Sequence, residues 1–197
     1  LESKRRLLQV VYAKTGLSLD PDIFTIGFAR RATGYKRADL IRSDLDRLKD
    51  IASRSGPFQL VFAGKAHPGD TGGKEIIRRI FRAKKALRRE LRIVYLDDYN
   101  MDLAAKMTAG VDLWLNTPQY PLEASGTSGM KAAVNGVPSF SVLDGWWVEG
   151  HIEGVTGWSV GERCAAEGSP AERRAEAESL YRTLQDVILP LYHPPRD

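Results

Sequence analysis

The chain is poor in cysteine and has no long apolar run. Its 197 residues include a single cysteine, Cys164, which excludes an intrachain disulfide bond and favours a reducing compartment. No apolar stretch reaches the roughly 18 to 20 residues that a membrane-spanning helix needs, and we see no signal-peptide pattern. From these absences we expect a cytoplasmic protein with no membrane partner.

Metal and nucleic-acid sites also lack support in the sequence. The histidines are far apart and do not have the spacing of metal ligands, so we expect no metal site at His67, His151 or His193. The net charge is +4, and much of the excess lies between residues 78 and 92, where basic and apolar residues interleave. This pattern indicates the solvated face of an amphipathic helix. It lacks the interleaved aromatics of single-strand binders, so we expect no nucleic-acid partner.

Apolar β-rich runs and helical segments alternate along a chain that is long enough for one domain. The strands are nearly continuous apolar runs, which is typical of a parallel sheet covered by helices on both faces. The sequence therefore predicts an α/β, Rossmann-like fold, with ligands at the carboxyl ends of the strands. The predicted strands are Phe24–Ala29, Phe58–Ala63, Ile93–Leu96, Val111–Leu115 and Ser139–Leu143, and the predicted helices are 2–15, 36–53, 73–90, 100–109, 127–135 and 170–189.

The segment from Glu123 to Lys131 is the most informative stretch. It joins a carboxylate to a loop rich in glycine, serine and threonine, and the loop ends where a helix is predicted to begin. The unpaired N–H groups and the positive dipole end of a helix start suit a phosphate. Lys131 lies close enough to reach an aldehyde or an anion held at this loop. The alternative is a Gly-rich turn followed by a surface lysine.

A second candidate site follows the first strand, where Arg30, Arg31, Lys36 and Arg37 fall within eight residues. Guanidinium groups match phosphate oxygens in a bidentate geometry, so a cluster at a strand exit fits an anion clamp. A basic surface turn is the alternative from these residues alone.

Several separate blocks closely resemble one enzyme family. They are GFARRATGYKR, VFAGKAHPGD, IVYLDDYNMDLA, GVDLWLNTPQYPLEASGTSGMK and VLDGWWVEG, in this order. The chain resembles the α-glucan phosphorylases, which include the glycogen, starch and maltodextrin enzymes, and it is most similar to their short bacterial branch. The resemblance runs from about Lys4 to Tyr192.

This resemblance implies a particular place in a larger protein. Residues 1–197 would be the single Rossmann-like C-terminal domain of a two-domain glycosyltransferase of the GT-B type, with the N-terminal domain absent. The start at Leu1, inside a helix-like pattern, fits this expectation. We expect the isolated piece to be inactive, and the resemblance leaves homo-oligomer formation open.

The resemblance also implies a reaction and a cofactor. The enzyme would transfer a terminal glucosyl unit of an α-1,4-glucan to inorganic phosphate, giving glucose 1-phosphate. Pyridoxal 5′-phosphate would be bound as a Schiff base to Lys131, and its phosphate would act as proton donor and acceptor beside the substrate phosphate.

Residue roles follow from the resemblance only. Lys131, Arg31 and Lys36 would be catalytic, and Arg31 would hold inorganic phosphate. Positions that match contacts to the sugar are Tyr35, Glu123, Ser125 and the backbone at Gly126. Positions that match contacts to the cofactor are Lys131, Arg30, Lys36, Tyr99, Thr127 and Ser128. Members of the family carry bulkier residues where this chain has Ala32-Thr33-Gly34, a departure that concerns the shape of this loop and not its cations.

Two other functions remain open. A nucleotide-sugar glycosyltransferase of the same fold would use Arg31 and Lys36 on a diphosphate, and it would not bind pyridoxal phosphate. A non-catalytic module that binds glucan or phosphate would work without a second domain. The sequence assigns no role to Lys65, and we expect Trp146 and Trp147 to pack beneath the site.

Overall fold

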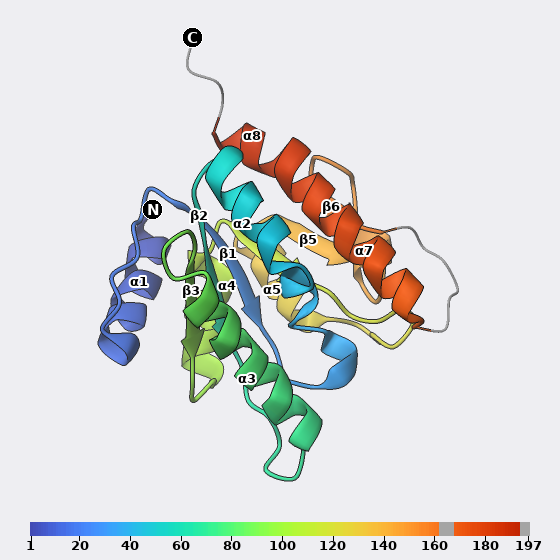
Figure 1. The fold of residues 1–197 in the computed structure, drawn as a ribbon, viewed down its shortest axis with the longest axis horizontal. Coiled ribbons are helices and arrows are strands. Elements are labelled where there is room, and N and C mark those ends of the chain that lie inside the picture. Colours follow the sequence, from blue (N-terminus) through green and yellow to red (C-terminus); the bar gives the residue numbers. More distant parts are fainter. Residues whose placement is uncertain (162–167, 194–197) are drawn as a thin grey trace.

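A computed structural model describes residues 1–161 and 168–193. Within them six strands form one sheet, in which every neighbouring pair is parallel, in the order β3-β2-β1-β4-β5-β6 (Figure 1). This is the strand order of the Rossmann fold. From β1 the first half of the sheet extends toward one edge, and from β4 the second half extends toward the other edge, so the strand order reverses between β1 and β4. The strands are β1 (Phe24–Ala29), β2 (Phe58–Ala63), β3 (Arg92–Leu96), β4 (Leu113–Asn116), β5 (Ser139–Val142) and β6 (Gly157–Val160).

Helices connect the strands and cover both faces of the sheet, so the predicted α/β architecture is confirmed. One layer contains α1, α4 and α5, and the other contains α2, α3 and α7. The helical elements are α1 (Glu2–Thr15), η1 (Gly34–Lys36), η2 (Leu40–Arg42), α2 (Leu45–Arg54), α3 (Thr71–Ala86), α4 (Met101–Gly110), α5 (Thr127–Val134), α6 (Trp147–Gly150), α7 (Pro170–Thr183), the π-helical η3 (Leu184–Ile188) and α8 (Leu189–Tyr192).

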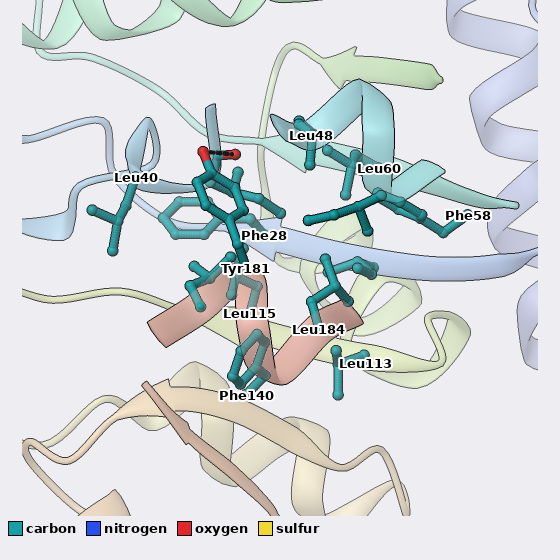
Figure 2. Packing of buried hydrophobic residues seen from close by; sticks show 14 of the residues in the cluster. Phe28, Leu40, Leu48, Phe58, Leu60, Leu113, Leu115, Phe140, Tyr181 and Leu184 are labelled. Carbon is teal, nitrogen blue, oxygen red and sulfur yellow. Dashed lines mark hydrogen bonds between the residues drawn. The ribbon is translucent and has the colours of Figure 1, made fainter. Parts of the chain in front are cut away.

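Each face of the sheet has its own hydrophobic core. Phe24 and Phe28 of β1 join the larger core under α2, α3 and α7, whereas Ala29 joins the smaller core under α1, α4 and α5. Figure 2 shows part of the larger core, in which Tyr181 of α7 lies among strand residues such as Leu115. The Tyr181 hydroxyl donates a hydrogen bond of 3.0 Å to the carbonyl oxygen of Ile41, which ties α7 to η2.

The predicted helix over 36–53 is wrong in its first half. Two short 3₁₀ turns replace it, and α2 begins only at Leu45. The first turn ends at Arg37, whose φ of 47° is left-handed, and Asp44 caps α2 by accepting a hydrogen bond of 2.9 Å from the Arg47 N–H. The apolar residues of this segment therefore fill the core from irregular turns and not from one helix.

Two elements that follow β4 in the chain were not predicted from the sequence. The strand β6 pairs with β5, but its sequence Gly-Trp-Ser-Val is too short and mixed to form an apolar run. The short helix α6 follows β5. The last predicted helix, 170–189, continues through the π-helical turn and α8 to Tyr192.

No helix in the described ranges is long and apolar enough to cross a membrane. Cys164 lies outside the described residues.

Candidate functional site

A pocket with a volume of about 420 Å³ lies at the carboxyl ends of β1 and β4, where the strand order reverses. Ligands of doubly wound sheets bind at this position. The structure brings all the candidate site residues of the sequence analysis to this pocket, and they come from separate segments of the chain. These lining residues are Arg30, Arg31, Tyr35, Lys36, Tyr99, Glu123, Ser125, Gly126, Thr127, Ser128 and Lys131.

A buried cluster of charges forms one wall of the pocket. The Glu123 carboxylate accepts hydrogen bonds from Arg30 Nη1 at 2.7 Å and from Arg30 Nη2 at 3.0 Å. Lys36 Nζ donates to the same carboxylate at 2.5 Å. The side chains of Arg30, Lys36 and Glu123 are only 8%, 7% and 6% exposed. Two cations are therefore paired with one anion in a region that is shielded from water.

The environment keeps Glu123 ionised. Burial alone raises the pKa of the Glu123 carboxyl, but hydrogen bonds and charges from Arg30 and Lys36 outweigh it and hold this pKa below its ordinary value. The backbone N–H of Glu123 donates to Asp144 Oδ2 at 2.9 Å, which fixes the loop. Arg30 also donates to Asn116, whose side-chain amide donates to Ser141 Oγ at 3.0 Å.

Two cations of the pocket are exposed. Arg31 and Lys131 both line the pocket, and both are exposed residues. Among the described residues, neither side chain has an ion-pair or hydrogen-bond partner. Arg31 and Lys131 can therefore reach a ligand without first leaving another contact.

The start of α5 faces the same pocket and lacks a capping side chain. Gly126 precedes the helix with a left-handed φ of 86°, and its position offers no side chain to accept a hydrogen bond from the first turn. The Ser128 Oγ is buried and has no hydrogen-bond partner among the described residues. First-turn N–H groups that no described side chain caps, a buried hydroxyl and the positive dipole end form a site for an anion.

Trp146 supports this loop from below. A Cβ at Gly129 would lie 2.7 Å from Trp146 Nε1, and a Cβ at Gly145 would lie 2.4 Å from the carbonyl oxygen of Ser125. The backbone N–H of Trp146 donates to that same oxygen at 2.8 Å. Trp147 is 1% exposed and packs against Trp146 with ring centroids 5.4 Å apart. Trp146 therefore packs against the loop as expected, and Trp147 lies buried behind it.

Two tyrosines complete the lining. The Lys36 ammonium lies 4.4 Å from the ring centroid of Tyr35, a distance that gives a cation–π contact. Tyr99 lies between β3 and α4, and its hydroxyl donates a long hydrogen bond of 3.5 Å to the Ala29 carbonyl. Burial raises the pKa of Tyr99, although the nearby charge of Arg30 opposes it. Tyr99 therefore stays a neutral phenol.

Other charged residues near the strand ends do not line the pocket. Lys65 pairs with Asp98 at 3.0 Å, and Asp97 pairs with Lys14 at 3.5 Å, so neighbouring carboxylates face different partners. Among the described residues, no group of histidine, cysteine and acidic side chains could hold a metal ion.

The sequence analysis missed two supporting residues, Asn116 and Asp144. Both lie at the ends of apolar strands, and each holds a pocket residue in place through one hydrogen bond. A polar side chain at the end of a buried strand was the available signal, because such positions meet at the ligand edge of a parallel sheet.

Comparison with known proteins identifies the family. The family model described as carbohydrate phosphorylase matches residues 1–157. The chain belongs to the carbohydrate phosphorylase family. It is 52% identical to a glycogen phosphorylase of Aquifex aeolicus over 90% of this chain, and 45% identical to a maltodextrin phosphorylase of Thermococcus litoralis over 90% of this chain. A glycogen phosphorylase of Mycobacterium tuberculosis is 41% identical over 89% of this chain.

These phosphorylases are much longer than the chain. The aligned region covers 25% of the Aquifex protein, 21% of the Thermococcus protein and 20% of the Mycobacterium protein. The resemblance found in the sequence motifs is confirmed by this match, and the chain spans about a quarter or less of these curated relatives.

Proposed function

We propose that this chain is the C-terminal, Rossmann-like part of an α-glucan phosphorylase. The complete enzyme would move the terminal α-1,4-linked glucosyl unit of a glucan to inorganic phosphate and release glucose 1-phosphate. Family membership supports the reaction class, and the low coverage of the relatives supports a further domain that would close over the pocket. We place that domain on the N-terminal side and the enzyme in the cytoplasm.

One observation carries the proposal. Lys131 is an exposed amine without a partner among the described residues, and it lines the same pocket as Arg30, Arg31, Lys36 and the open start of α5. A lysine that could anchor a cofactor covalently and several groups that could bind an anion therefore lie in one pocket. A pocket that bound only neutral sugar would not need this density of positive charge.

The residues present fit pyridoxal 5′-phosphate as the cofactor. Lys131 would hold the cofactor covalently through its amine. The buried hydroxyl of Ser128, the N–H group of Thr127 and the cations Arg30 and Lys36 would face its phosphate, and Tyr99 would line its ring. When bound, the cofactor supplies a phosphate group that donates and accepts a proton beside the substrate phosphate.

The chain's own residues would hold the reactants. Arg31 is free to bind the substrate phosphate, and the cations around it offset the repulsion between two neighbouring phosphates. Tyr35, Ser125 and the backbone at Gly126 would orient the sugar. Glu123 would accept from a sugar hydroxyl, since its three hydrogen bonds to Arg30 and Lys36 leave one of the about four lone-pair sites of the carboxylate.

The cofactor proposal is tested by borohydride reduction. The chain is incubated with pyridoxal 5′-phosphate, reduced and digested, and the peptides are weighed by mass spectrometry. We expect one pyridoxyl group, on the peptide that contains Lys131. A chain that stays unmodified while folded would contradict the cofactor and would favour a nucleotide-sugar transferase or a non-catalytic module.

The reaction is tested separately by glucose 1-phosphate release from maltodextrin. We expect no turnover by the 197-residue chain, because a single domain leaves the pocket open to water. The complete polypeptide should show turnover that depends on phosphate. Turnover by the isolated chain would show that no second domain is needed.

A further inference from the structure

A second pocket, with a volume of about 580 Å³, is lined by residues of α3 and α7. These two helices cover the same face of the sheet (Figure 1). The pocket shares no lining residue with the candidate active site. Its walls come from η2 and the residues on either side of it, from α3 and from α7. Four arginines line it, together with three carboxylates: Arg42, Arg79, Arg173, Arg174, Asp39, Asp44 and Glu178.

Three of the arginines converge on one buried carboxylate. Asp39 Oδ2 lies 3.2 Å from Arg42 Nη2 and 3.4 Å from Arg79 Nη1, and Asp39 Oδ1 lies 3.1 Å from Arg173 Nη2. The Asp39 side chain is 7% exposed, so the shared anion is inside the cluster and the cations surround it. One negative charge therefore faces three positive charges from three different elements.

The arginines of this cluster carry an excess of positive charge and at least one N–H group without a partner in the part of the chain that the structure describes. A guanidinium carries several N–H groups, and the Arg42 Nε is buried without a hydrogen-bond partner among the described residues. Burial lowers the pKa of Arg42, and the charges of Arg79 and Arg173 add to this effect against the attraction of Asp39. The arginines thus repel one another at close range, and a second anion would relieve that repulsion.

The other carboxylates reduce the positive charge of the pocket but leave an excess, because four arginines and three carboxylates line it. Asp44 uses its Oδ1 to cap α2 through the Arg47 N–H. Glu75 is shared between arginines, since its Oε1 lies 3.5 Å from Arg79 Nε and 3.0 Å from Arg82 Nη1. Glu178 is exposed at the rim.

The start of α7 adds positive potential. Arg173 and Arg174 lie in the first turns of this helix, where the dipole disfavours cations and favours anions. Arg174 has no ion-pair partner among the described residues. Two arginines at this place do not stabilise α7, whereas an anion in the pocket could interact with both of them.

We propose that this pocket binds a small anion that carries a phosphate group, at a site separate from the candidate active site. Guanidinium groups from three elements can surround phosphate oxygens in a way that surface lysines cannot. The concave shape and the volume suit a small molecule and not a flat protein surface.

Binding there would fasten α7 to the elements before α2. The same elements already meet through Arg37, which donates to both carboxylate oxygens of Glu176 in α7. Arg37 follows Lys36 directly in the chain, and Lys36 belongs to the charge cluster of the candidate active site. An anion that bridges Arg42 and Arg173 would therefore stabilise the contact between Arg37 and Glu176. That contact lies next in the chain to Lys36 of the active-site charge cluster.

The proposal is tested by an amide NMR titration of the chain with inorganic phosphate at constant ionic strength. Phosphate should also bind the candidate active site, so the readout has to be resolved by residue. We expect saturable shifts at amides 42–44 and 173–178, in addition to those at 30–31 and 126–131. The double variant R79Q/R173Q should weaken binding at the first set by about tenfold or more, and leave the second set unchanged.

A matched control is R78Q, which removes an exposed α3 arginine that pairs only with Glu75 at 3.7 Å among the described residues and does not line the pocket. The Arg79 and Arg173 side chains are 46% and 36% exposed, and Asp39 keeps Arg42, so the double variant should fold. Should it unfold, R174Q tests the same pocket without touching Asp39. Absence of saturable shifts at 42–44 and 173–178 in the wild-type chain, equal shifts with added chloride, or unchanged binding in the variants would overturn the proposal.

Discussion

The Glu123 carboxylate accepts two hydrogen bonds from the Arg30 guanidinium, at 2.7 and 3.0 Å. Lys36 donates a third at 2.5 Å. The two cations that we assign to the cofactor phosphate are thus held in place by an internal anion from another loop. This arrangement keeps both cations ordered, and an incoming phosphate has to share them with Glu123.

Replacement of Glu123 by glutamine should lower stability and strengthen anion binding. The neutral amide leaves Arg30 and Lys36 as buried cations without a charged partner, so we expect a loss of about 1–3 kcal/mol in the free energy of unfolding. Inorganic phosphate should recover more stability in the variant than in the parent chain. Urea denaturation with and without phosphate measures both effects.

Glu149→Gln is the control for this change, because Glu149 is exposed and lies outside the pocket. It should leave both quantities unchanged. A Glu123→Gln chain that is as stable as the parent and no more responsive to phosphate would show that the cluster does not restrain the cations.

The lowered pKa of Glu123 predicts a pH dependence of stability. The folded carboxyl titrates below the ordinary glutamate value, so the folded state binds fewer protons in the window between the two pKa values. The contribution of Glu123 to the free energy of unfolding is complete above the ordinary glutamate pKa. It is lost as the pH falls through the lowered pKa of the folded state. Urea denaturation between about pH 3 and pH 6 should show a shallower decline in Glu123→Gln than in the parent chain. Equal slopes in the two chains would contradict the lowered pKa.

Much of the site was predictable because residues in parallel strands converge by topology. Arg30, Tyr99 and Glu123 are far apart in sequence, yet each follows a strand or precedes a helix at the same edge of the sheet. Knowledge of the alternation of strands and helices was therefore enough to expect them together. The ion pair between Glu123 and Arg30 was not predictable, because it depends on the path of two loops and not on any local pattern.

The fold was predictable where the apolar runs were long. The strands β1 and β2 match their predicted ranges, since each is a continuous apolar run between turns. The segment after Lys36 was misread, because its apolar residues fit a helical period while the left-handed φ of Arg37 breaks the helix. The strand β6 was missed because pairing with β5, and not its own composition, makes it a strand.

Arg31→Ala should weaken phosphate binding with little effect on folding. The side chain is exposed and has no hydrogen-bond or ion-pair partner among the described residues, so its removal breaks no such interaction. Loss of a charged hydrogen bond costs about 1.5–3 kcal/mol, which corresponds to roughly tenfold to hundredfold weaker binding. The phosphate dependence of glucose 1-phosphate release by the complete enzyme measures this, with Arg89→Ala as an exposed control. An unchanged phosphate dependence would remove Arg31 from the site.

Glu176→Ala should destabilise the fold strongly. Arg37 is buried, with a side chain that is 5% exposed, and it pairs with Glu176 through both carboxylate oxygens. Removal of one partner of a buried ion pair leaves an uncompensated charge, at a cost of about 3–5 kcal/mol. Glu178→Ala, on the exposed side of the same helix, should change the free energy of unfolding far less. Similar effects of the two substitutions in urea denaturation would contradict the importance of this pair.

Lys131 should be the only lysine that links the cofactor. Its competitors differ in their contacts, because Lys36 is buried against Glu123 and Lys65 pairs with Asp98 outside the pocket. The Lys36 nitrogen would have to leave its ion pair with the Glu123 carboxylate, at 2.5 Å, before it could attack an aldehyde. Lys131 lines the pocket without such a partner among the described residues.

Lys131→Ala should therefore abolish the pyridoxyl adduct after borohydride reduction. Lys36→Ala should retain the adduct but release the cofactor more readily before reduction, since a cation that faces the phosphate is gone. Lys65→Ala should behave as the parent chain, which makes it the control. Peptide mapping by mass spectrometry distinguishes the three outcomes. Recovery of the pyridoxyl group on a peptide with Lys36 or Lys65, and not on the one with Lys131, would overturn the assignment of the anchor and the orientation of the cofactor in the pocket.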